Sequence, residues 1–239
     1  MNKGLPNQRR LAVYATGEHV CAYLPERTAC TLFVDPHEPL NGKIYDGLMA
    51  RGFRRSGDYI YRPKCPACTA CQSLRIPVPT FRRSRSHRRC IRSNAELSVH
   101  AARPVFNAEH FELYRRYVHA RHADSQMEGL TPEQYLGFLT APWCDSVFYE
   151  FRCGDALLAV AVADRLPQSL SAVYTFYDPR QAERGLGTLA ILWLIEEARR
   201  SRRPYLYLGY WIEESAKMRY KSGFRPHEIF NGTGWARVE

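Results

Sequence analysis

Residues 184–211 read RGLGTLAILWLIEEARRSRRPYLYLGYW, and this stretch decides the predicted fold. A turn with Gly185 and Gly187 opens it, and apolar residues then recur at helical spacing through residue 200. The pattern predicts a long helix that is amphipathic at first and more buried farther along. After a basic turn, YLYLGYW is rich in aromatic residues, which predicts a strand over residues 205–211.

The residues before this stretch predict the strands that pack with that helix. SVFYEFRC at 146–153, a Gly-Asp turn and ALLAVAVADRL at 156–166 form a hairpin pattern. SAVYTFY at 171–177 predicts a third strand. The chain therefore runs from a hairpin through a strand and a glycine turn to a long helix and another strand.

Further helices are expected on both sides of these strands. NAEHFELYRRYVHARH at 107–122 and TPEQYLGFL at 131–139 have helical patterns, the second with Thr131 as N-cap and Pro132 in its first position. A helix is also expected around EESAKMRYK, residues 213–221.

The first 103 residues have a different pattern. They carry short apolar strands, LAVYA, CTLFV, YIYRP and SLRIPV, separated by proline, glycine and charged turns. NGKIYDGLMARG at 41–52 predicts a short helix with Asn41 as N-cap and Gly52 as stop. We therefore predict an α+β protein with two domains: a small, cysteine-rich N-terminal strand/helix domain (1–103) and a larger C-terminal domain with a central mixed sheet (104–239).

Charge is distributed unevenly between these halves. The net charge is +10; residues 1–103 carry 18 Lys/Arg against 7 Asp/Glu, whereas the remainder carries 16 against 17. RRSRSHRRCIR at 82–92 holds six arginines and no acid. At helical spacing four of them share one face, where phosphates would relieve their mutual repulsion. A polyanionic partner on the first half is the hypothesis, and a merely solvated basic surface is the alternative.

The amino-acid composition indicates the general class of the protein. The chain of 239 residues is 45% hydrophobic and 24% charged, as in globular proteins. Its first 20 residues lack the apolar stretch of a signal peptide, and its longest apolar runs are too short to span a bilayer. We expect a soluble, cytoplasmic protein without membrane partners, whose cysteines are thiols or metal ligands rather than disulfides.

Three of the eight cysteines are closely spaced in CPACTACQSLRIPV, residues 65–78. A Cys-x₂-Cys-x₂-Cys pattern is typical of metal or redox chemistry, with plain thiols as the alternative. A closed metal site needs a fourth ligand. Cys144 and Cys153, in the second half, are expected to be structural.

Aromatic and cationic residues alternate in LYLGYWIEESAKMRYKSGFRPHEI, residues 206–229. Such interleaving suits nucleic acid or an acidic ligand. The stretch resembles the C-terminal signature of the arginyl-tRNA–protein transferase family. DRLPQSLSAVYTFYDP at 164–179, CAYLPERTA at 21–29 and GFRRSGDYIYRPKC at 52–65 also fit that family, so the resemblance covers nearly the whole chain in order. Within the family, the chain is most similar to the bacterial aspartate/glutamate leucyltransferase branch.

The resemblance implies a reaction. Leucine would move from leucyl-tRNA to the N-terminal α-amine of proteins that begin with Asp or Glu, marking them for N-degron degradation. The element order is also similar to the GNAT acyltransferase core, although ERGLGT at 183–188 matches the pyrophosphate turn only in part, and the family uses no CoA. Arginine as the donated residue, a CoA-dependent GNAT acetyltransferase, and a nucleic-acid-binding module with a zinc knuckle are the alternatives. The oligomeric state is not predicted.

Site residues follow from the chemistry and the resemblance. Asp164 ends a core strand and is a candidate orienter or base, with a turn cap as the alternative. Tyr174, Tyr177 and Tyr210 are candidates to position the ester or the terminal adenosine, or are ordinary strand aromatics. Acceptor binding needs cations to pair with a carboxylate. The candidate cations are Lys217, Arg219, Lys221, Arg75 and Arg27, and Tyr220 is a further candidate for substrate binding.

Two further groups of residues complete the predicted site. Phosphates of the tRNA would bind the arginines of residues 82–92, namely Arg82, Arg83, Arg85, Arg88, Arg89 and Arg92. The family's N-terminal cysteine motif implies Cys21 as the fourth metal ligand beside Cys65, Cys68 and Cys71, with Cys30 and Cys90 as substitutes. Eukaryotic members of the family look like iron–sulfur proteins with an N-terminal Cys-x-x-Cys pair; here Leu24 replaces the second cysteine. Both an iron–sulfur cluster and zinc therefore remain open.

Overall fold

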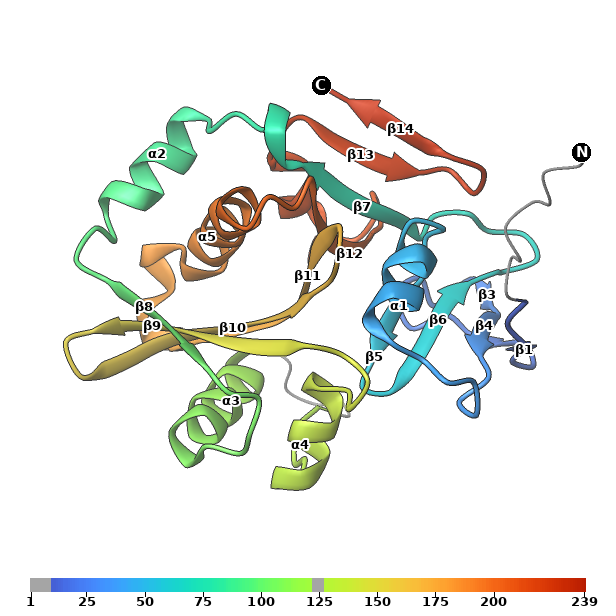
Figure 1. The fold of residues 1–239 in the computed structure, drawn as a ribbon, viewed down its shortest axis with the longest axis horizontal. Helices are drawn as coiled ribbons and strands as arrows, with labels where there is room; N and C mark the ends of the chain where they lie inside the picture. Colours follow the sequence, from blue (N-terminus) through green and yellow to red (C-terminus); the bar gives the residue numbers. More distant parts are fainter. Residues whose placement is uncertain (1–9, 122–126) are drawn as a thin grey trace, which may run out of the picture.

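The fold is α+β, with one large curved sheet, a smaller sheet at its side and helices on both faces of the large sheet (Figure 1). It is described from a computed structural model that covers residues 10–121 and 127–239. His122, the last residue of the helix expected at 107–122, lies outside the described residues, as does the start of the N-terminal segment that is expected to lack a signal peptide. No described helix is long and apolar enough to cross a membrane.

The large sheet has eight strands among the described residues. In spatial order they are β14 (Trp235–Val238), β13 (His227–Phe230), β7 (Gln72–Pro77), β12 (Tyr205–Trp211), β11 (Ser169–Tyr177), β10 (Ala156–Arg165), β9 (Ser146–Cys153) and β8 (Ser98–Ala102). All neighbours are antiparallel except β11 and β12, which are parallel, so the sheet is mixed as expected.

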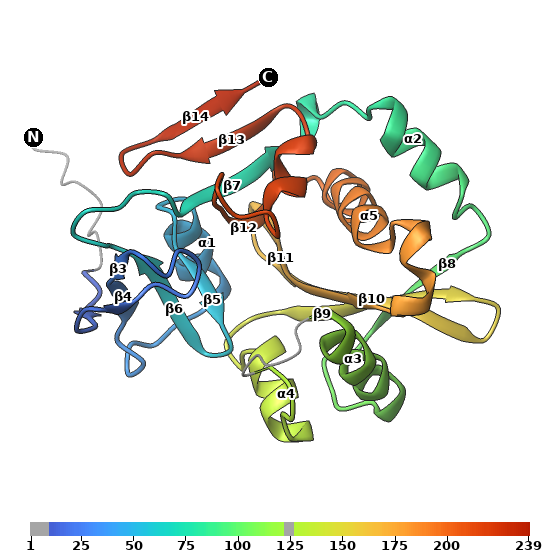
Figure 2. The same cartoon turned by 180° about the vertical axis from the view of Figure 1, so that it is seen from behind.

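Helices cover both faces of this sheet because its central strands are apolar on both faces. The predicted helix at 184–200 is α5 (Leu186–Arg200), and the sheet curves around it (Figure 2). Its apolar side chains and those of β7, β10 and β12 form the largest core cluster. The opposite face packs against α3 (Ala108–Arg121) and α4 (Pro132–Leu139), which form a second core cluster with β10 and β11. Thr131 caps α4 as predicted, in a capping box with Gln134.

The N-terminal part packs against the side of this core. Its four-stranded sheet has the order β1 (Val13–Ala15), β4 (Thr31–Val34), β6 (Tyr59–Pro63) and β5 (Arg54–Ser56), and β2 (His19–Val20) pairs with β3 (Thr28–Ala29). The short helix expected after Asn41 is α1 (Gly42–Met49), and the Asn41 side chain accepts the backbone N–H of Ile44. The core of this part includes Leu166 and Tyr207 of the larger part, so the two parts share buried surface.

The large sheet crosses the expected domain boundary at residue 103. Strands β7 and β8 lie before this residue, yet both belong to the eight-stranded sheet. Between them, η1 (Val78–Thr80) and α2 (Arg85–Arg92) follow β7, and α2 lies beside α5. By sheet membership, the small N-terminal part therefore ends before β7.

One expected helix is wrong. Residues 213–218 form turns, followed by the 3₁₀ helix η3 (Arg219–Gly223). The backbone bonds here run from Ser215 to Ile212, Met218 to Ser215 and Lys221 to Met218, each spanning three residues rather than the four of an α-helix. Another 3₁₀ helix, η2 (Pro179–Arg184), leads into α5.

Strands β11 and β12 pair only over Ser169–Ser171 and Tyr205–Tyr207. Beyond these pairs β12 continues along β7 and β11 continues along β10. A small cavity lies where the parallel pairing ends. We call the region between residues 171–177 of β11 and 207–211 of β12 the fork.

Candidate active site

The fork is the candidate active site because polar and charged side chains from both parts of the chain converge on it. The cavity there is small, about 10 Å³, which is room for about one water molecule. Its polar lining comes from β5, β7, β11 and β12. The residues are Arg54, Arg55, Ser73, Ser171, Tyr207 and Gly209.

Arg54 lies in the fork without a carboxylate partner. Its guanidinium carbon is 5.9 Å from the ring centroid of Tyr61 and 5.8 Å from that of Tyr210. A Cβ on Gly209, whose φ is +71°, would lie 3.0 Å from the Arg54 Nη1 atom, so glycine leaves the space that this guanidinium uses. Within residues 10–121 and 127–239, no acidic side chain forms an ion pair with Arg54, which is half-buried.

Arg55 has the opposite surroundings, because strand neighbours point to opposite sides. Its guanidinium forms a bidentate pair with Asp164, at 2.7 Å from Nε to Oδ2 and 2.6 Å from Nη2 to Oδ1. Ser146 donates a further hydrogen bond to Asp164, at 2.8 Å. The Asp164 side chain has no exposed surface.

The prediction that Asp164 is a base or orienter of substrate is therefore not supported. Both of its oxygens are engaged by Arg55 and Ser146, and its side chain has no exposed surface. Its position joins the small sheet to β10, which makes it a residue that holds the fork together. This role lies closer to the structural alternative than to catalysis.

The candidate tyrosines also have mainly structural surroundings. Tyr210 is 1% exposed, and its hydroxyl lies 3.1 Å from the carbonyl oxygens of Gly52 and Tyr61. Burial raises the pKa of Tyr210 far above its ordinary value, so its hydroxyl stays protonated. Its ring nevertheless backs Arg54 in the fork.

Tyr174 and Tyr177 lie on β11 near α3. Tyr174 packs among the rings of Tyr117 and Phe138, at 6.3 and 5.4 Å between centroids. The Tyr177 hydroxyl accepts a hydrogen bond from Arg121 at 2.8 Å. These contacts favour the alternative that Tyr174 is an ordinary strand aromatic.

Lys221 is the one candidate cation of the 206–229 stretch that is buried, and it lies beside the fork. Its Nζ donates to the carbonyl oxygen of Tyr210 at 2.5 Å. Burial, and then the positive charge of Arg54, lower the pKa of Lys221 to about 7. Lys217 is exposed on the turn before η3, and Arg219 and Tyr220 are exposed at the start of η3.

Arg75 and Arg27 do not join Lys221. The guanidinium of Arg75 lies between the rings of Tyr205 and Trp235, at 3.8 and 4.1 Å from their centroids, and pairs with Glu228 at 2.7 Å. Its charge is already balanced, so a substrate-binding role is not supported. Arg27 is exposed and links the cysteine loop to the 206–229 stretch: it pairs with Glu214 at 3.2 Å and donates to the Cys68 Sγ atom at 3.3 Å.

The predicted metal ligands come close together but do not form a metal geometry. Burial, and then the neighbouring thiols of Cys21, Cys65 and Cys68, raise the pKa of Cys71 to about 12, so the four thiols interact. Cys65 and Cys68 also pair through an isolated backbone bridge. In the part of the chain that the structure describes, no three His, Cys, Asp or Glu side chains have the arrangement of a metal site. The donor set suits zinc or an iron–sulfur cluster, and the metal stays a prediction.

The two substitute ligands lie elsewhere. The Cys30 thiol donates to the carbonyl oxygen of Thr16, and the Cys90 thiol donates to the carbonyl oxygens of Arg184 and Gly185. Cys90 thus fastens the glycine turn before α5. Arg184, the basic residue of that turn, pairs with Glu96 at 2.6 Å.

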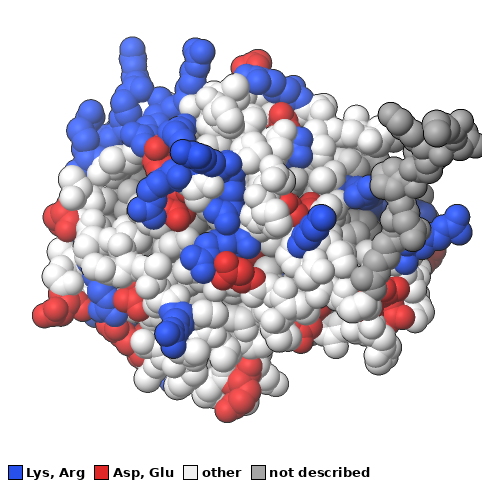
Figure 3. Space-filling model, viewed as in Figure 1, with Lys and Arg blue, Asp and Glu red and all other residues white. Residues whose placement is uncertain are grey.

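The arginines of residues 82–92 form an exposed basic surface on and before α2. Figure 3 shows lysine and arginine side chains projecting where α2 lies. All six arginines are exposed, and of these only Arg83 has an ion pair among the described residues, with Glu196 at 2.8 Å. Ser84 begins α2 in a capping box with His87. The remaining positive charges are free to meet an anion.

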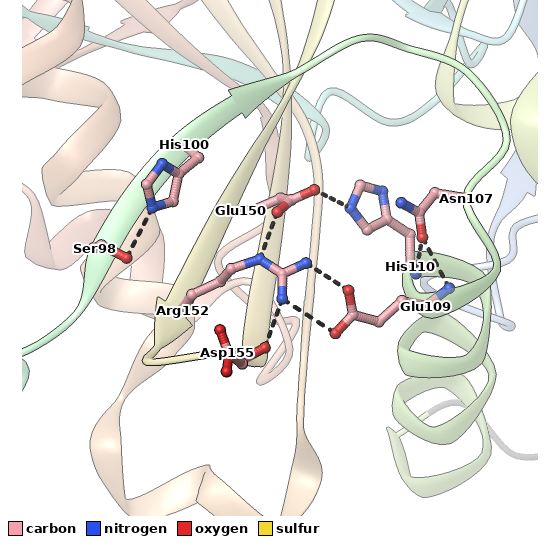
Figure 4. Close-up of polar contacts among 8 residues, drawn as sticks. All are labelled: Ser98, His100, Asn107, Glu109, His110, Glu150, Arg152 and Asp155. Carbon is pink, nitrogen blue, oxygen red and sulfur yellow. Dashed lines mark hydrogen bonds and ion pairs between the residues drawn. The ribbon is translucent and has the colours of Figure 1, made fainter.

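A second polar cluster lies at the start of α3 (Figure 4). His110 Nε2 is 2.7 Å from Glu150 Oε1, and Arg152 bridges Glu150 and Glu109 at 2.6 and 2.5 Å. His110 is 1% exposed. Since these groups pair with one another and fasten α3 to β9, we assign them to the fold rather than to the site.

Comparison with known proteins assigns the chain to a family. The model of the N-terminal part of arginine-tRNA-protein transferase matches residues 19–89, and that of the C-terminal part matches residues 109–231, more than half of the chain. The chain belongs to the arginine-tRNA-protein transferase family. The fork of this chain contains Arg54 and Ser73 from the first matched part and Gly209 from the second, and the neighbouring Lys221 also belongs to the second.

Relatives within the family are similar over nearly their whole length. Proteins from Alkalilimnicola ehrlichii and Halorhodospira halophila are 55% and 54% identical to it, over 96% and 98% of this chain and 97% and 100% of their own. One from Pseudomonas aeruginosa is 50% identical over 96% of this chain and 97% of its own. All three carry the name aspartate/glutamate leucyltransferase. Among solved structures, L-PGS from Bacillus licheniformis aligns with 60% of this chain and 47% of its own, at 13% identity and a TM-score of 0.46.

Sequence reasoning missed Arg54, although the segment that contains it was among those that fit the family. The signal was the adjacent pair Arg54-Arg55, although no strand was predicted there; the structure places the pair on β5, where alternate residues face opposite sides. Two adjacent arginines on a strand must have different partners, and one of them faces the fork.

Proposed function

We propose that this protein transfers leucine from leucyl-tRNA to the N-terminal α-amine of proteins that begin with Asp or Glu. The observation that carries the proposal is the 54–55% identity, over almost complete lengths, to relatives named aspartate/glutamate leucyltransferase. Acceptors modified in this way carry a destabilising N-terminus and enter N-degron degradation in the cytoplasm.

The chemistry asks little of the protein beyond positioning. The aminoacyl ester is already activated, and an α-amine with a pKa near 8 is partly neutral at physiological pH. The protein must hold the amine against the ester carbonyl and exclude wrong acceptors. The fork supports this role because helix α1 and strands from both parts of the chain meet there.

The arginines of α2 are proposed to bind the tRNA backbone. They are exposed and mostly without acidic partners among the described residues, which is the footprint expected for phosphate contacts. Such contacts position the tRNA without reading the amino acid.

The remaining features are proposed on the family resemblance. The part of the sheet that encloses α5 is GNAT-like but takes aminoacyl-tRNA in place of CoA. Cys21, Cys65, Cys68 and Cys71 hold an iron–sulfur cluster or zinc, which would fasten the cysteine loops beside the 206–229 stretch. Arg27 already links those two regions.

The test is a transfer assay with protein purified under anaerobic conditions. Labelled leucyl-tRNA or arginyl-tRNA is incubated with peptides that begin with Asp, Glu, Lys or Ala. Leucine on the Asp and Glu peptides alone is the expected result. Arginine on those peptides would instead support the second candidate, which the name of the matched family favours. Absence of transfer, with stabilisation by acetyl-CoA but not by tRNA, would overturn both.

A further inference from the structure

Arg54 and Lys221 form a pair of neighbouring cations that the described protein does not neutralise. Lys221 is 8% exposed and donates a hydrogen bond to the Tyr210 carbonyl; Arg54 lies against the ring of the same tyrosine. The charge of Arg54 acts on Lys221, so the two groups are close. Among the described side chains, no carboxylate forms an ion pair with either of them.

Proteins rarely keep buried cations together without a counter-charge, because each loses hydration and both repel. Arg54 is half-buried and Lys221 is buried, and the two buried arginines among the described residues follow that rule. Arg55 pairs with Asp164, and Arg75 pairs with Glu228. The exception lies in the fork, which indicates that the missing negative charge arrives with a ligand.

We propose that Arg54, supported by Lys221, binds the side-chain carboxylate of the acceptor's N-terminal Asp or Glu and thereby selects acidic acceptors. This inference rests on the proposed function. A guanidinium matches a carboxylate in bidentate geometry, and the rings of Tyr61 and Tyr210 hold it in one orientation. The Ser73 hydroxyl, which belongs to the same cavity lining, is a further donor.

A carboxylate fits the fork better than a tRNA phosphate does. The cavity has room for about one water molecule, so a phosphodiester with its two sugars is excluded from it, and a carboxylate of three heavy atoms is the smaller of the two groups. The phosphate-binding features of the chain lie on and before α2, where six arginines are exposed.

The experiment compares Arg54→Gln with the unmodified protein on four peptides that differ only in an N-terminal Asp, Asn, Glu or Gln. We expect kcat/KM for the Asp and Glu peptides to fall roughly 10- to 100-fold, and that for the Asn and Gln peptides to change little, because only the acidic peptides are deprived of a charge-assisted hydrogen bond. KM for leucyl-tRNA should stay unchanged. Lys221→Met should reduce the same acid-to-amide ratio by a smaller factor.

Arg62→Gln is the matched control. Arg62 lies on the neighbouring strand β6, its guanidinium carbon is 4.9 Å from the Phe53 ring centroid, and it has no ion pair among the described residues. Because it does not line the fork, its replacement should leave the acid-to-amide ratio unchanged. Arg54→Lys, which keeps the charge but not the bidentate geometry, should retain part of the ratio.

Three results would overturn the inference. An equal fall of all four peptides in Arg54→Gln would indicate a structural role. A raised KM for leucyl-tRNA with an unchanged acid-to-amide ratio would assign the fork to phosphate. If both the acid-to-amide ratio and the transfer rates stayed unchanged in Arg54→Gln, Arg54 would have no role in acceptor recognition.

Chemical modification of the wild-type protein provides a measurement that does not depend on whether a variant folds. Arginine modification by phenylglyoxal, mapped by mass spectrometry, should be blocked at Arg54 by the Asp peptide and not by the Asn peptide; equal reactivity with both would count against the inference. Failure of the unmodified protein to transfer leucine is a separate outcome, because it would remove the proposed function before any variant is compared.

Discussion

Two adjacent arginines on β5, Arg54 and Arg55, have different roles because their side chains have different surroundings. Arg55 points inward to the fully buried Asp164, whereas Arg54 points into the fork and meets no acid among the described residues. Replacing one partner of a buried pair leaves the other charged and unsatisfied, which costs more than the pair itself contributes.

Asp164→Asn should therefore reduce the free energy of unfolding by about 3–5 kcal/mol, because Arg55 would keep its charge without a counter-ion. Urea unfolding followed by circular dichroism measures this reduction. The double variant Arg55→Met with Asp164→Leu should be less destabilised than Asp164→Asn. If Asp164→Asn kept full stability but abolished transfer, the carboxylate would be catalytic after all.

At the scale of elements, α2 is the part of the fold whose exposed face is specialised. Its Ser84 capping box and its packing beside α5 hold the helix, and its own arginines, Arg85, Arg88, Arg89 and Arg92, form no ion pair with α5 among the described residues. Their charges can thus be removed with little effect on folding, which separates binding from stability.

Replacing Arg85, Arg88, Arg89 and Arg92 with Gln should weaken leucyl-tRNA binding. In a plot of the logarithm of the binding constant against the logarithm of the salt concentration, the slope should become shallower by roughly one unit for each phosphate that the protein no longer neutralises. The Asp-to-Asn acceptor ratio should not change. Fluorescence titrations of tRNA at salt concentrations from about 50 to about 200 mM test this. Arg115→Gln with Arg116→Gln on α3 is the control; an equal weakening there would show that only net charge matters.

Most individual elements could be predicted from sequence, because their signals are local. Thr131 and Asn41 cap helices as their positions indicated, and the apolar run after Gly185 is α5. The helix expected around residues 213–221 failed because three-residue turns replace it and Lys221 is drawn onto the end of β12. Periodicity carries no information on such a tertiary contact.

The whole molecule depends on pairings that no local pattern reveals. Strand β7 lies between β12 and β13 although it precedes both by more than a hundred residues. The pair of Arg55 with Asp164 spans 109 positions, and the fork exists only because of such contacts. Family resemblance supplied the reaction, but the acid-binding arginine became visible only in three dimensions.

Burial of Lys221 should give the whole molecule a pH-dependent stability. The pKa of Lys221 is lowered to about 7 in the folded chain from 10.5, so the unfolded chain binds more protons between these values. This group's contribution to the free energy of unfolding should therefore rise as pH increases from about 7 to 10.5. Lys221→Met should remove that increase, as thermal unfolding across this range would show. If stability rose equally with pH in Lys221→Met, groups other than Lys221 would be responsible for the increase.

The interior position of β7 in the large sheet has a consequence for synthesis. Both strands that flank it are made later, and β13 is among the last elements to leave the ribosome. Until then β7 presents two open edges, next to arginine-rich residues 82–92 that carry no acid. An interior strand of the large sheet therefore stays open at both edges until almost the whole chain has been synthesised.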